Sequence, residues 1–284
     1  MSRLRLAFLT AMAMLVFAAN SLLCREALAK GHIDASSFTL VRVGSGALVL
    51  GVLLLIKLRR YSLGGSWLAA AALFGYAAGF SFAYVSLSAG TGALILFGAV
   101  QVTMIGFGLW RGERLSGLQI IGGIAASGGL VWLMLPGIKA PSLLGALIMF
   151  GAGICWGVYS LLGRRAQEPT IATAGNFMRA VPFAVILFLL TENAAPVTGL
   201  GVAYAAASGA LASGLGYALW YAVLPTLPAT RAATLQLSVP ILAACGGMVF
   251  LDEVITLRFG FAAMAVLGGI ALFIASKQQT QSEP

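Results

Sequence analysis

Long apolar segments recur from one end of the chain to the other, and they restrict the fold more than any other feature. Two examples are Gly46–Ile56 ("GALVLGVLLLI") and Leu143–Val158 ("LLGALIMFGAGICWGV"). An apolar segment of about 20 residues spans the hydrocarbon core of a bilayer as a helix. Only 9% of the residues are charged, against about 25% in soluble domains, which is too little charge to cover a solvated surface. The sequence therefore predicts a protein that crosses a membrane many times.

Charged residues and gaps that contain Pro or Gly divide the chain into ten apolar segments. None of the gaps is long enough to hold a soluble domain. The first segment follows Arg3 and Arg5 in the manner of a secretory signal, but a partner segment inside the chain resembles it, so we expect it to be retained. The predicted fold class is all-α integral membrane, with ten transmembrane helices. Their approximate bounds are 5–24, 35–56, 67–88, 91–110, 115–135, 142–163, 170–190, 200–224, 230–250 and 255–275.

The lysines and arginines of the short loops predict how the chain is oriented. Such residues are more frequent in cytoplasmic loops than in outer loops. With the N-terminus inside, the cytoplasmic side would carry Arg3, Arg5, Lys57, Arg59, Arg60, Arg111, Arg114, Arg164, Arg165, Arg231 and Lys277, and the outer side Arg25, Lys30, Lys139 and Arg258. Both termini are therefore expected in the cytoplasm, with the protein integral to the plasma membrane, a bacterial inner membrane.

An internal repeat divides the chain into two similar halves. "NSLLCREA" begins at Asn20 and "YSLLGRRA" begins at Tyr159, 139 positions later. "GERLS" (112–116) and "DEVIT" (252–256) match at an offset of 140. We expect a first five-helix unit at residues 1–138 and a second at 139–284. Because five is odd, the second unit would be inverted, an arrangement that places a ligand site near the midplane between the halves.

Several other classes of protein do not fit the residues. The net charge of +9 is spread in ones and twos between apolar segments, whereas nucleic-acid binding needs a basic face. Cys24, Cys155 and Cys245 lie in separate segments without metal-ligand spacing. The only histidine, His32, lies in a loop, so no nucleophile–base pair can form within the membrane. We expect no enzyme activity, no metal and no cofactor.

The acidic residues indicate the charge of the substrate. All eight lie in loops, at helix ends or in the tail, whereas an ion-coupled pump keeps a carboxylate at membrane depth. We therefore expect either a facilitator or a transporter with an unobvious ion site, for a neutral or zwitterionic small molecule. It would work as a monomer, with the lipid bilayer and the substrate as its partners.

The chain resembles the ten-span, EamA-type branch of the drug/metabolite transporter superfamily. The similar stretches are "WGVYSLLGRRA" (156–166), "GYALWYAVLPTLPATRAATLQLSVPIL" (216–242) and the two corners at 112–116 and 252–256. Within the superfamily, Trp156, Tyr217 and Trp220 make it most similar to the aromatic-amino-acid exporters. The resemblance implies a transporter that exports or facilitates passage of small metabolites, with amino acids foremost and aromatic ones among them, by alternating access. A multidrug exporter and a non-transporting scaffold or receptor remain alternatives.

The candidate site residues are aromatic or polar side chains within the predicted helices. For each, packing against a neighbouring helix is the alternative to contact with substrate. The candidates for substrate binding are Trp156, Tyr76, Phe80, Tyr84, Gln101, Tyr159, Tyr217 and Gln236. We expect Trp156 to be the aromatic wall on which a substrate ring stacks.

A second group of residues is expected to serve gating or structure. It comprises Asn20, Arg42, Arg179, Pro182 and Pro240. Arg42 and Arg179 match at an offset of 137 and are the only charges well inside predicted helices. They would contact a carboxylate or line the vestibule; the structural alternatives are hydrogen bonds to helix-end carbonyls or snorkelling toward the interface. The two prolines would interrupt their helices and give hinges. By the resemblance, Gln101 stands where relatives commonly have proline, and Asn20 lies on the helix that carries a glutamate in the small multidrug members.

Overall fold

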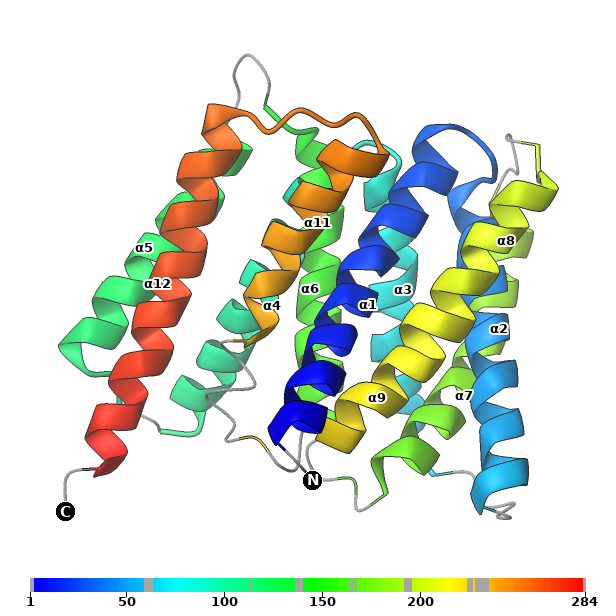
Figure 1. Cartoon of the computed structure of the whole chain (residues 1–284), viewed down its shortest axis with the longest axis horizontal. Coiled ribbons are helices and arrows are strands. Elements are labelled where there is room, and N and C mark those ends of the chain that lie inside the picture. Colours follow the sequence, from blue (N-terminus) through cyan, green and yellow to red (C-terminus); the bar gives the residue numbers. More distant parts are fainter. Residues whose placement is uncertain are drawn as a thin grey trace.

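The computed structural model shows a bundle of helices that run between two opposite ends of the molecule (Figure 1). It describes residues 3–58, 64–112, 114–135, 140–163, 166, 168–191, 196–223, 227 and 235–282. Within these ranges there is no β-strand. Both chain termini lie at the lower end in the view of Figure 1.

The helices follow the predicted apolar segments closely. Eight described helices are long and apolar enough to cross a membrane, and two shorter apolar helical segments, Gly199–Leu215 and Ser238–Phe250, bring the described total to ten. The predicted all-helical membrane fold is thus confirmed. The ninth predicted segment began at residue 230, and 228–234 lie outside the described residues. The elements are α1 (Arg3–Ala29), α2 (Ala35–Leu53), the π-helix η1 (Leu54–Leu58), α3 (Trp67–Tyr84), α4 (Ala89–Trp110), α5 (Gly117–Met134), α6 (Leu143–Gly163), α7 (Pro169–Leu190), α8 (Gly199–Ala207), the π-helix η2 (Ser208–Leu215), α9 (Gly216–Val223), α11 (Ser238–Phe250) and α12 (Leu257–Ser282).

Polar residues at the helix starts fix where several of these helices begin. The side chains of Asp34, Ser66 and Thr198 accept hydrogen bonds from backbone N–H groups in the first turns of α2, α3 and α8. Ser116 forms a reciprocal capping box with Gln119 at the start of α5. The first N–H groups of a helix have no acceptor within it, so a side-chain oxygen at this position stabilises the end.

Glycines allow α6 to pack closely against two neighbours. A β-carbon at Gly79 would lie 3.0 Å from Ala152 Cβ, so α3 and α6 are in close contact there. A β-carbon at Gly153 would lie 2.5 Å from Ala99 Cβ, so α6 approaches α4 even more closely at this point. These glycines occur in pairs spaced by four residues, a spacing that lets helices approach. The glycines thus account for the close packing of α6 within the chain.

Neighbouring helices come from distant parts of the sequence. The bundle packs α2 against α7, α4 against α11, and α5 against α12. Helix α1 contacts α8, η2, α9 and α11, whereas α6 contacts α3 and α4. The α5–α12 pair forms one edge of the molecule in Figure 1. Large apolar side chains such as Leu48, Trp110 and Leu190 are exposed on the outside of the bundle, where a membrane protein meets lipid.

The two prolines do not act on their helices in the same way. Pro182 lies inside α7, which is helical from Pro169 to Leu190. Pro240 is the third residue of α11, and a turn at Leu237 separates α11 from the helical residues 235–236 before it. A proline cannot donate a hydrogen bond to the residue four positions earlier, which for Pro240 is Gln236, so this turn lies where an interruption is expected. That either proline acts as a hinge stays a prediction.

Candidate functional site

A small cavity lies in the interior of the bundle. Its volume is about 30 Å³, which is room for about one water molecule. Both halves of the sequence contribute to its wall, through α1, α3, α4, α6, η2, α9 and the residues just before α11. The lining residues are Phe17, Asn20, Ser21, Tyr76, Phe80, Leu96, Phe97, Trp156, Ala212, Tyr217 and Gln236.

The indole of Trp156 is surrounded by aromatic rings of the protein. Its ring centroid lies 4.7 Å from that of Tyr76, 5.2 Å from that of Tyr217 and 5.5 Å from that of Tyr159. Tyr217 also meets Phe17 edge-on, with centroids 6.2 Å apart. Such pairs stabilise one another beyond their buried area. These three rings limit the room for a substrate ring on the indole.

A chain of hydrogen bonds connects one side of the cavity to the interior of the bundle. Ser208 Oγ donates to Asn20 Oδ1 at 2.6 Å. Asn20 Nδ2 donates to the hydroxyl oxygen of Tyr76 at 3.5 Å, and Arg42 Nη2 donates to the same oxygen at 2.9 Å. Ser208 is the first residue of η2, and π-helical turns within longer helices frequently occur at functional sites.

Arg42 is buried behind the aromatic wall of the cavity. It is 1% exposed, and its Cζ lies 5.0 Å from the ring centroid of Tyr76 and 4.8 Å from that of Phe80. Its Nη1 has no hydrogen-bond partner within the described structure. The ion pairs found among the described residues join Arg25 to Glu253 and Lys30 to Glu26, so neither involves this guanidinium.

Arg179, the repeat-related counterpart of Arg42, has a different environment. Its Nη1 donates to the carbonyl oxygen of Gly64 at 2.6 Å, just before the start of α3. This carbonyl precedes the N-cap residue Ser66, so the contact is with the segment before α3 and not with a helix end, and the role of Arg179 stays a prediction. The two arginines therefore occupy related positions but make unrelated contacts.

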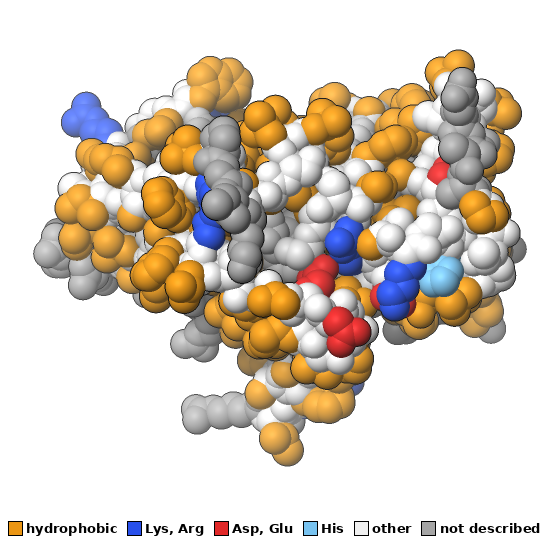
Figure 2. Space-filling model, turned by 90° about the horizontal axis from the view of Figure 1, so that it is seen from above, with side chains coloured by type: hydrophobic (Ala, Val, Ile, Leu, Met, Phe, Trp, Pro, Cys, Tyr) orange, Lys and Arg blue, Asp and Glu red, His pale blue; other side chains and the backbone are white. Residues whose placement is uncertain are grey.

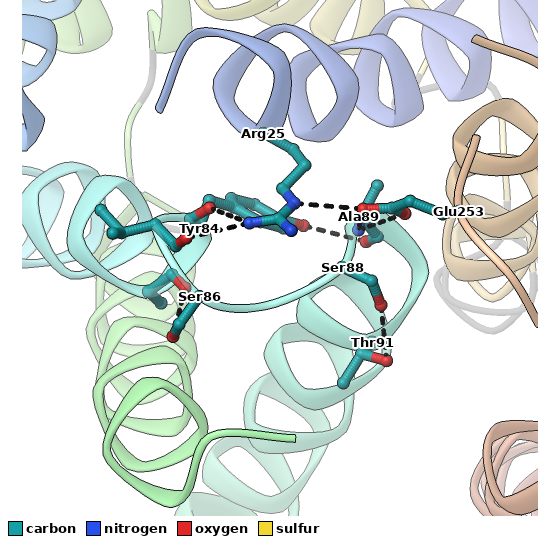
Figure 3. Close-up of polar contacts among 9 residues, drawn as sticks. Arg25, Tyr84, Ser86, Ser88, Ala89, Thr91 and Glu253 are labelled. Atoms are coloured by element: carbon teal, nitrogen blue, oxygen red, sulfur yellow. Dashed lines mark hydrogen bonds and ion pairs between the residues drawn. The ribbon is translucent and has the colours of Figure 1, made fainter. Parts of the chain in front are cut away.

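A polar network joins four segments at the end of the bundle opposite the termini (Figure 3). Arg25 Nε donates to Glu253 Oε1 at 3.1 Å, and Arg25 Nη1 donates to the carbonyl oxygens of Tyr84 and Val85, each at 3.0 Å. Glu253 also accepts from the backbone N–H of Ala89, with distances of 3.1 and 2.9 Å to its two oxygens. Figure 2 shows this end from above, with acidic and basic side chains next to each other near its centre. The network thus ties α1 to the end of α3, to the start of α4 and to the loop after α11.

The structure brings together only some of the candidate residues. Those that line the cavity are Trp156, Tyr76, Phe80, Tyr217, Gln236 and Asn20. Tyr84 is fully buried outside this lining, and its hydroxyl donates to the carbonyl oxygen of Ala89 at 3.1 Å. The other candidates outside the lining are Gln101, Tyr159, Arg42, Arg179, Pro182 and Pro240.

Sequence reasoning did not identify several residues that the structure places at the cavity or above it. Ser21, Leu96, Phe97 and Ala212 belong to the lining, beside Phe17, which matches Trp156 at an offset of 139 in the repeat and was the one ring that the repeat pointed to. Arg25 and Glu253 were placed in loops without a role. The internal repeat could have indicated this pair. Arg25 matches Arg164, and Glu253 matches Glu113, so each half of the sequence has an arginine and a glutamate at these positions. Arg164 and Glu113 lie outside the described part of the chain.

Comparisons with known proteins agree on a transporter fold. A family model described as the EamA-like transporter family matches residues 143–275. An uncharacterized protein of Pseudomonas aeruginosa is 55% identical over 274 residues, which are 96% of each protein. The threonine/homoserine exporter RhtA of Salmonella typhimurium is 32% identical over 163 residues, which are 54% of this chain and 53% of the exporter. The RhtA protein of Escherichia coli K12 is 34% identical over 135 residues, which are 44% of each protein. The matches thus span about half the length of these exporters. A solved crystal structure shares the fold over 96% of this chain and 98% of its own, with a TM-score of 0.68 and 19% identity.

The apolar helices and the match to a family of transporters define an integral-membrane transport protein, which is not an enzyme class. The chain belongs to the EamA-like transporter family of the drug/metabolite transporter superfamily. Its relatives with a named substrate export threonine and homoserine. The expected likeness to aromatic-amino-acid exporters is therefore replaced by a relationship to the family and, more distantly, to threonine/homoserine exporters.

Proposed function

We propose that the protein moves small neutral or zwitterionic metabolites, foremost amino acids, across the membrane by alternating access through the central cavity. The observation that carries this proposal is the cavity itself, whose wall mixes Asn20, Ser21 and Gln236 with aromatic rings and is shared by both halves of the sequence. Ligand sites in inverted-repeat transporters lie where the halves meet. A volume of about 30 Å³ is too small for an amino acid, so this conformation would be a closed one.

The contacts between helices support a division into units at residues 1–138 and 139–284. If α1–α5 of the first unit are exchanged with α6, α7, α8–α9, α11 and α12 of the second, the most extensive contacts have counterparts, whereas smaller ones such as α1–α3 and α1–α4 do not. The α1–α11 contact corresponds to α6–α4, and the α2–η2 contact corresponds to α7–α3. The pairs α2–α7, α4–α11 and α5–α12 map onto themselves. Such reciprocity is what two related units with a common axis would give, and it suits a pair of alternating gates.

The proposed substrates are small amino acids such as threonine in preference to aromatic ones. The named relatives export threonine and homoserine. The faces of the Trp156 indole are close to Tyr76 and Tyr217, which disfavours stacking of a substrate ring. Aromatic amino acids remain the second candidate, because the wall as a whole is rich in rings.

Flux measurements in liposomes test this proposal. Purified protein would be reconstituted and supplied with labelled threonine, homoserine, phenylalanine, a nucleoside and a cationic dye. We expect uptake of the amino acids down their gradient, without an imposed ion gradient. Transport of the dye alone would favour a multidrug exporter, and transport of nothing would favour a scaffold or receptor.

We also propose that both termini lie in the cytoplasm of a bacterial cell, with the protein in the inner membrane. In a variant without native cysteines, Lys30→Cys should react with an impermeant thiol reagent added outside, whereas Arg114→Cys should react only after the cells are opened. The reverse pattern would contradict the orientation.

A further inference from the structure

At the cavity wall, the hydroxyl group of Tyr76 can donate one more hydrogen bond than the described structure uses. Its oxygen already accepts hydrogen bonds from Arg42 and Asn20. A phenol hydroxyl has one hydrogen of its own to donate, and no acceptor for it is found within the described structure. Tyr76 lines the cavity, and only 6% of the residue is exposed. The free hydrogen therefore suits an acceptor that enters the cavity.

Behind Tyr76, the positive charge of Arg42 is not matched by a carboxylate of the described residues. A guanidinium remains charged in proteins, and an isolated charge in a membrane interior is costly. The rings of Tyr76 and Phe80 compensate in part through their faces. The described ion pairs lie elsewhere, and Nη1 has no partner there. An anion in the cavity would supply the missing charge.

The cavity wall has no charged group that would stabilise a cation in the same way. No Asp or Glu is among the lining residues. Asn20 Oδ1 already accepts from Ser208, and Ser21 and Gln236 are neutral. An ammonium group in the cavity would thus meet neutral acceptors, while a carboxylate would meet donors backed by a full charge.

We propose that the Asn20–Tyr76 side of the cavity is a carboxylate subsite, with the Tyr76 hydroxyl as the direct donor and Arg42 as the buried counter-charge. The site would recognise the carboxylate of the substrate and tolerate loss of its ammonium group. The substrate class is therefore small monocarboxylates, which includes 2-hydroxy acids as well as amino acids. This inference rests on the proposed amino-acid transport.

Competition for uptake tests the proposal without altering the protein. Uptake of a labelled amino acid that the parent protein transports, threonine in the first instance, would be challenged with two unlabelled analogues. One is 2,3-dihydroxybutanoate, which keeps the carboxylate and replaces the ammonium by a hydroxyl. The other is 1-amino-2-propanol, which lacks the carboxylate. We expect the hydroxy acid to compete at concentrations similar to those of threonine, and the amine not to compete.

Two tyrosine variants on α3 test the role of the hydroxyl. Tyr76→Phe should raise the half-saturating concentration of both carboxylates by roughly tenfold or more, as expected for loss of a charge-assisted hydrogen bond. Tyr84→Phe is the matched control, because it removes a buried hydroxyl that donates to Ala89 outside the cavity. Both variants would first be checked for a single symmetric peak in size-exclusion chromatography.

The outcomes separate this inference from the proposed function. If threonine and the other amino acids are not transported by the parent protein, the proposed function fails and the subsite fails with it. If they are transported but the amine competes as well as the hydroxy acid, only the carboxylate subsite is wrong. Equal effects of Tyr76→Phe and Tyr84→Phe on half-saturation would also overturn it.

Discussion

Arg25 and Glu253 lie 228 positions apart in the sequence and form an ion pair with 3.1 Å between Nε and Oε1. Both side chains are only partly exposed, and each also binds backbone groups of the α3–α4 turn. The pair joins α1 to the loop after α11, and these elements come from different halves of the chain. Movement of the halves apart at this end would have to break it.

Neutralising this ion pair should make the cavity easier to reach from the end opposite the termini. Glu253→Gln removes the charge but keeps an oxygen that can accept from the Ala89 N–H. The loss of about 1 kcal/mol expected for a partly exposed pair corresponds to roughly a fivefold shift toward open forms. In a background without native cysteines, Ser21→Cys on the cavity wall should then react faster with a thiol reagent.

Glu26→Gln provides the matched control for that experiment. It removes the more exposed ion pair with Lys30 at the same end of the bundle, but this pair lies within one helix region and crosses no interface. Its effect on labelling of Ser21→Cys should be small. A similar acceleration in both variants would mean that the Arg25–Glu253 pair has no special role in closure.

Gly209→Ala should destabilise the protein. Gly209 of η2 lies against α2 so closely that a β-carbon would collide with the carbonyl oxygen of Arg42 and the hydroxyl of Ser45. Overpacking of this kind costs about 1–3 kcal/mol. Thermal unfolding in detergent would measure the loss. Gly44→Ala on α2 is the control, because no described atom lies within 4 Å of its β-carbon, and it should leave the melting temperature unchanged or slightly raised.

Asp34→Ala should remove the N-terminal cap of α2, at a cost of about 1 kcal/mol in the free energy of unfolding. The Asp34 carboxylate accepts from the backbone N–H groups of Ser36 and Ser37 at 3.0 and 2.9 Å. Burial raises its pKa, but hydrogen bonds from these serines outweigh burial, so the pKa lies below its usual value.

The pH dependence of this cap follows from the lowered pKa. A carboxyl group whose pKa is lower in the folded state contributes its full stability above the unfolded-state pKa of about 4, and loses it as the pH falls through the folded-state value. The difference in melting temperature between the parent and Asp34→Ala should thus be constant near neutral pH and shrink in acid. Ser88→Ala is a control for pH, because the Ser88 hydroxyl does not titrate; it donates to Thr91 Oγ1 and caps no backbone N–H of α4, so its effect should not change in acid. A difference that grows in acid would contradict the argument.

Trp156→Ala should lower transport of every substrate without preference for aromatic ones. The indole packs on Tyr76, Tyr159 and Tyr217, so its removal would loosen the wall as a whole. Flux of threonine and phenylalanine would be compared in the same liposomes. Trp110→Ala, on a side chain that is 82% exposed, should have little effect. Selective loss of phenylalanine transport would instead support stacking of a substrate ring on Trp156.

The sequence by itself determined the membrane class, the number of helices and the sites of close helix contact. Each depends on local features. The length of an apolar segment decides whether it spans a bilayer, and a capping residue such as Asp34 or Ser116 marks where a helix begins. Glycine spacing, as at Gly75 and Gly79, shows where a neighbour can approach. The repeat offset and the absence of acidic residues inside the predicted helices were also visible without a structure.

Only the tertiary structure decided which polar side chains meet. Tyr76 and Tyr84 lie on the same stripe of α3, yet one lines the cavity and the other bonds to Ala89. Arg42 and Arg179 match in the repeat, yet one is buried beside aromatic rings and the other binds Gly64. The physical reason is that a helix apolar on all sides has no polar stripe to reveal its inward face. The rotation of each helix, and hence the pairing of residues as distant as Arg25 and Glu253, is fixed by packing between helices.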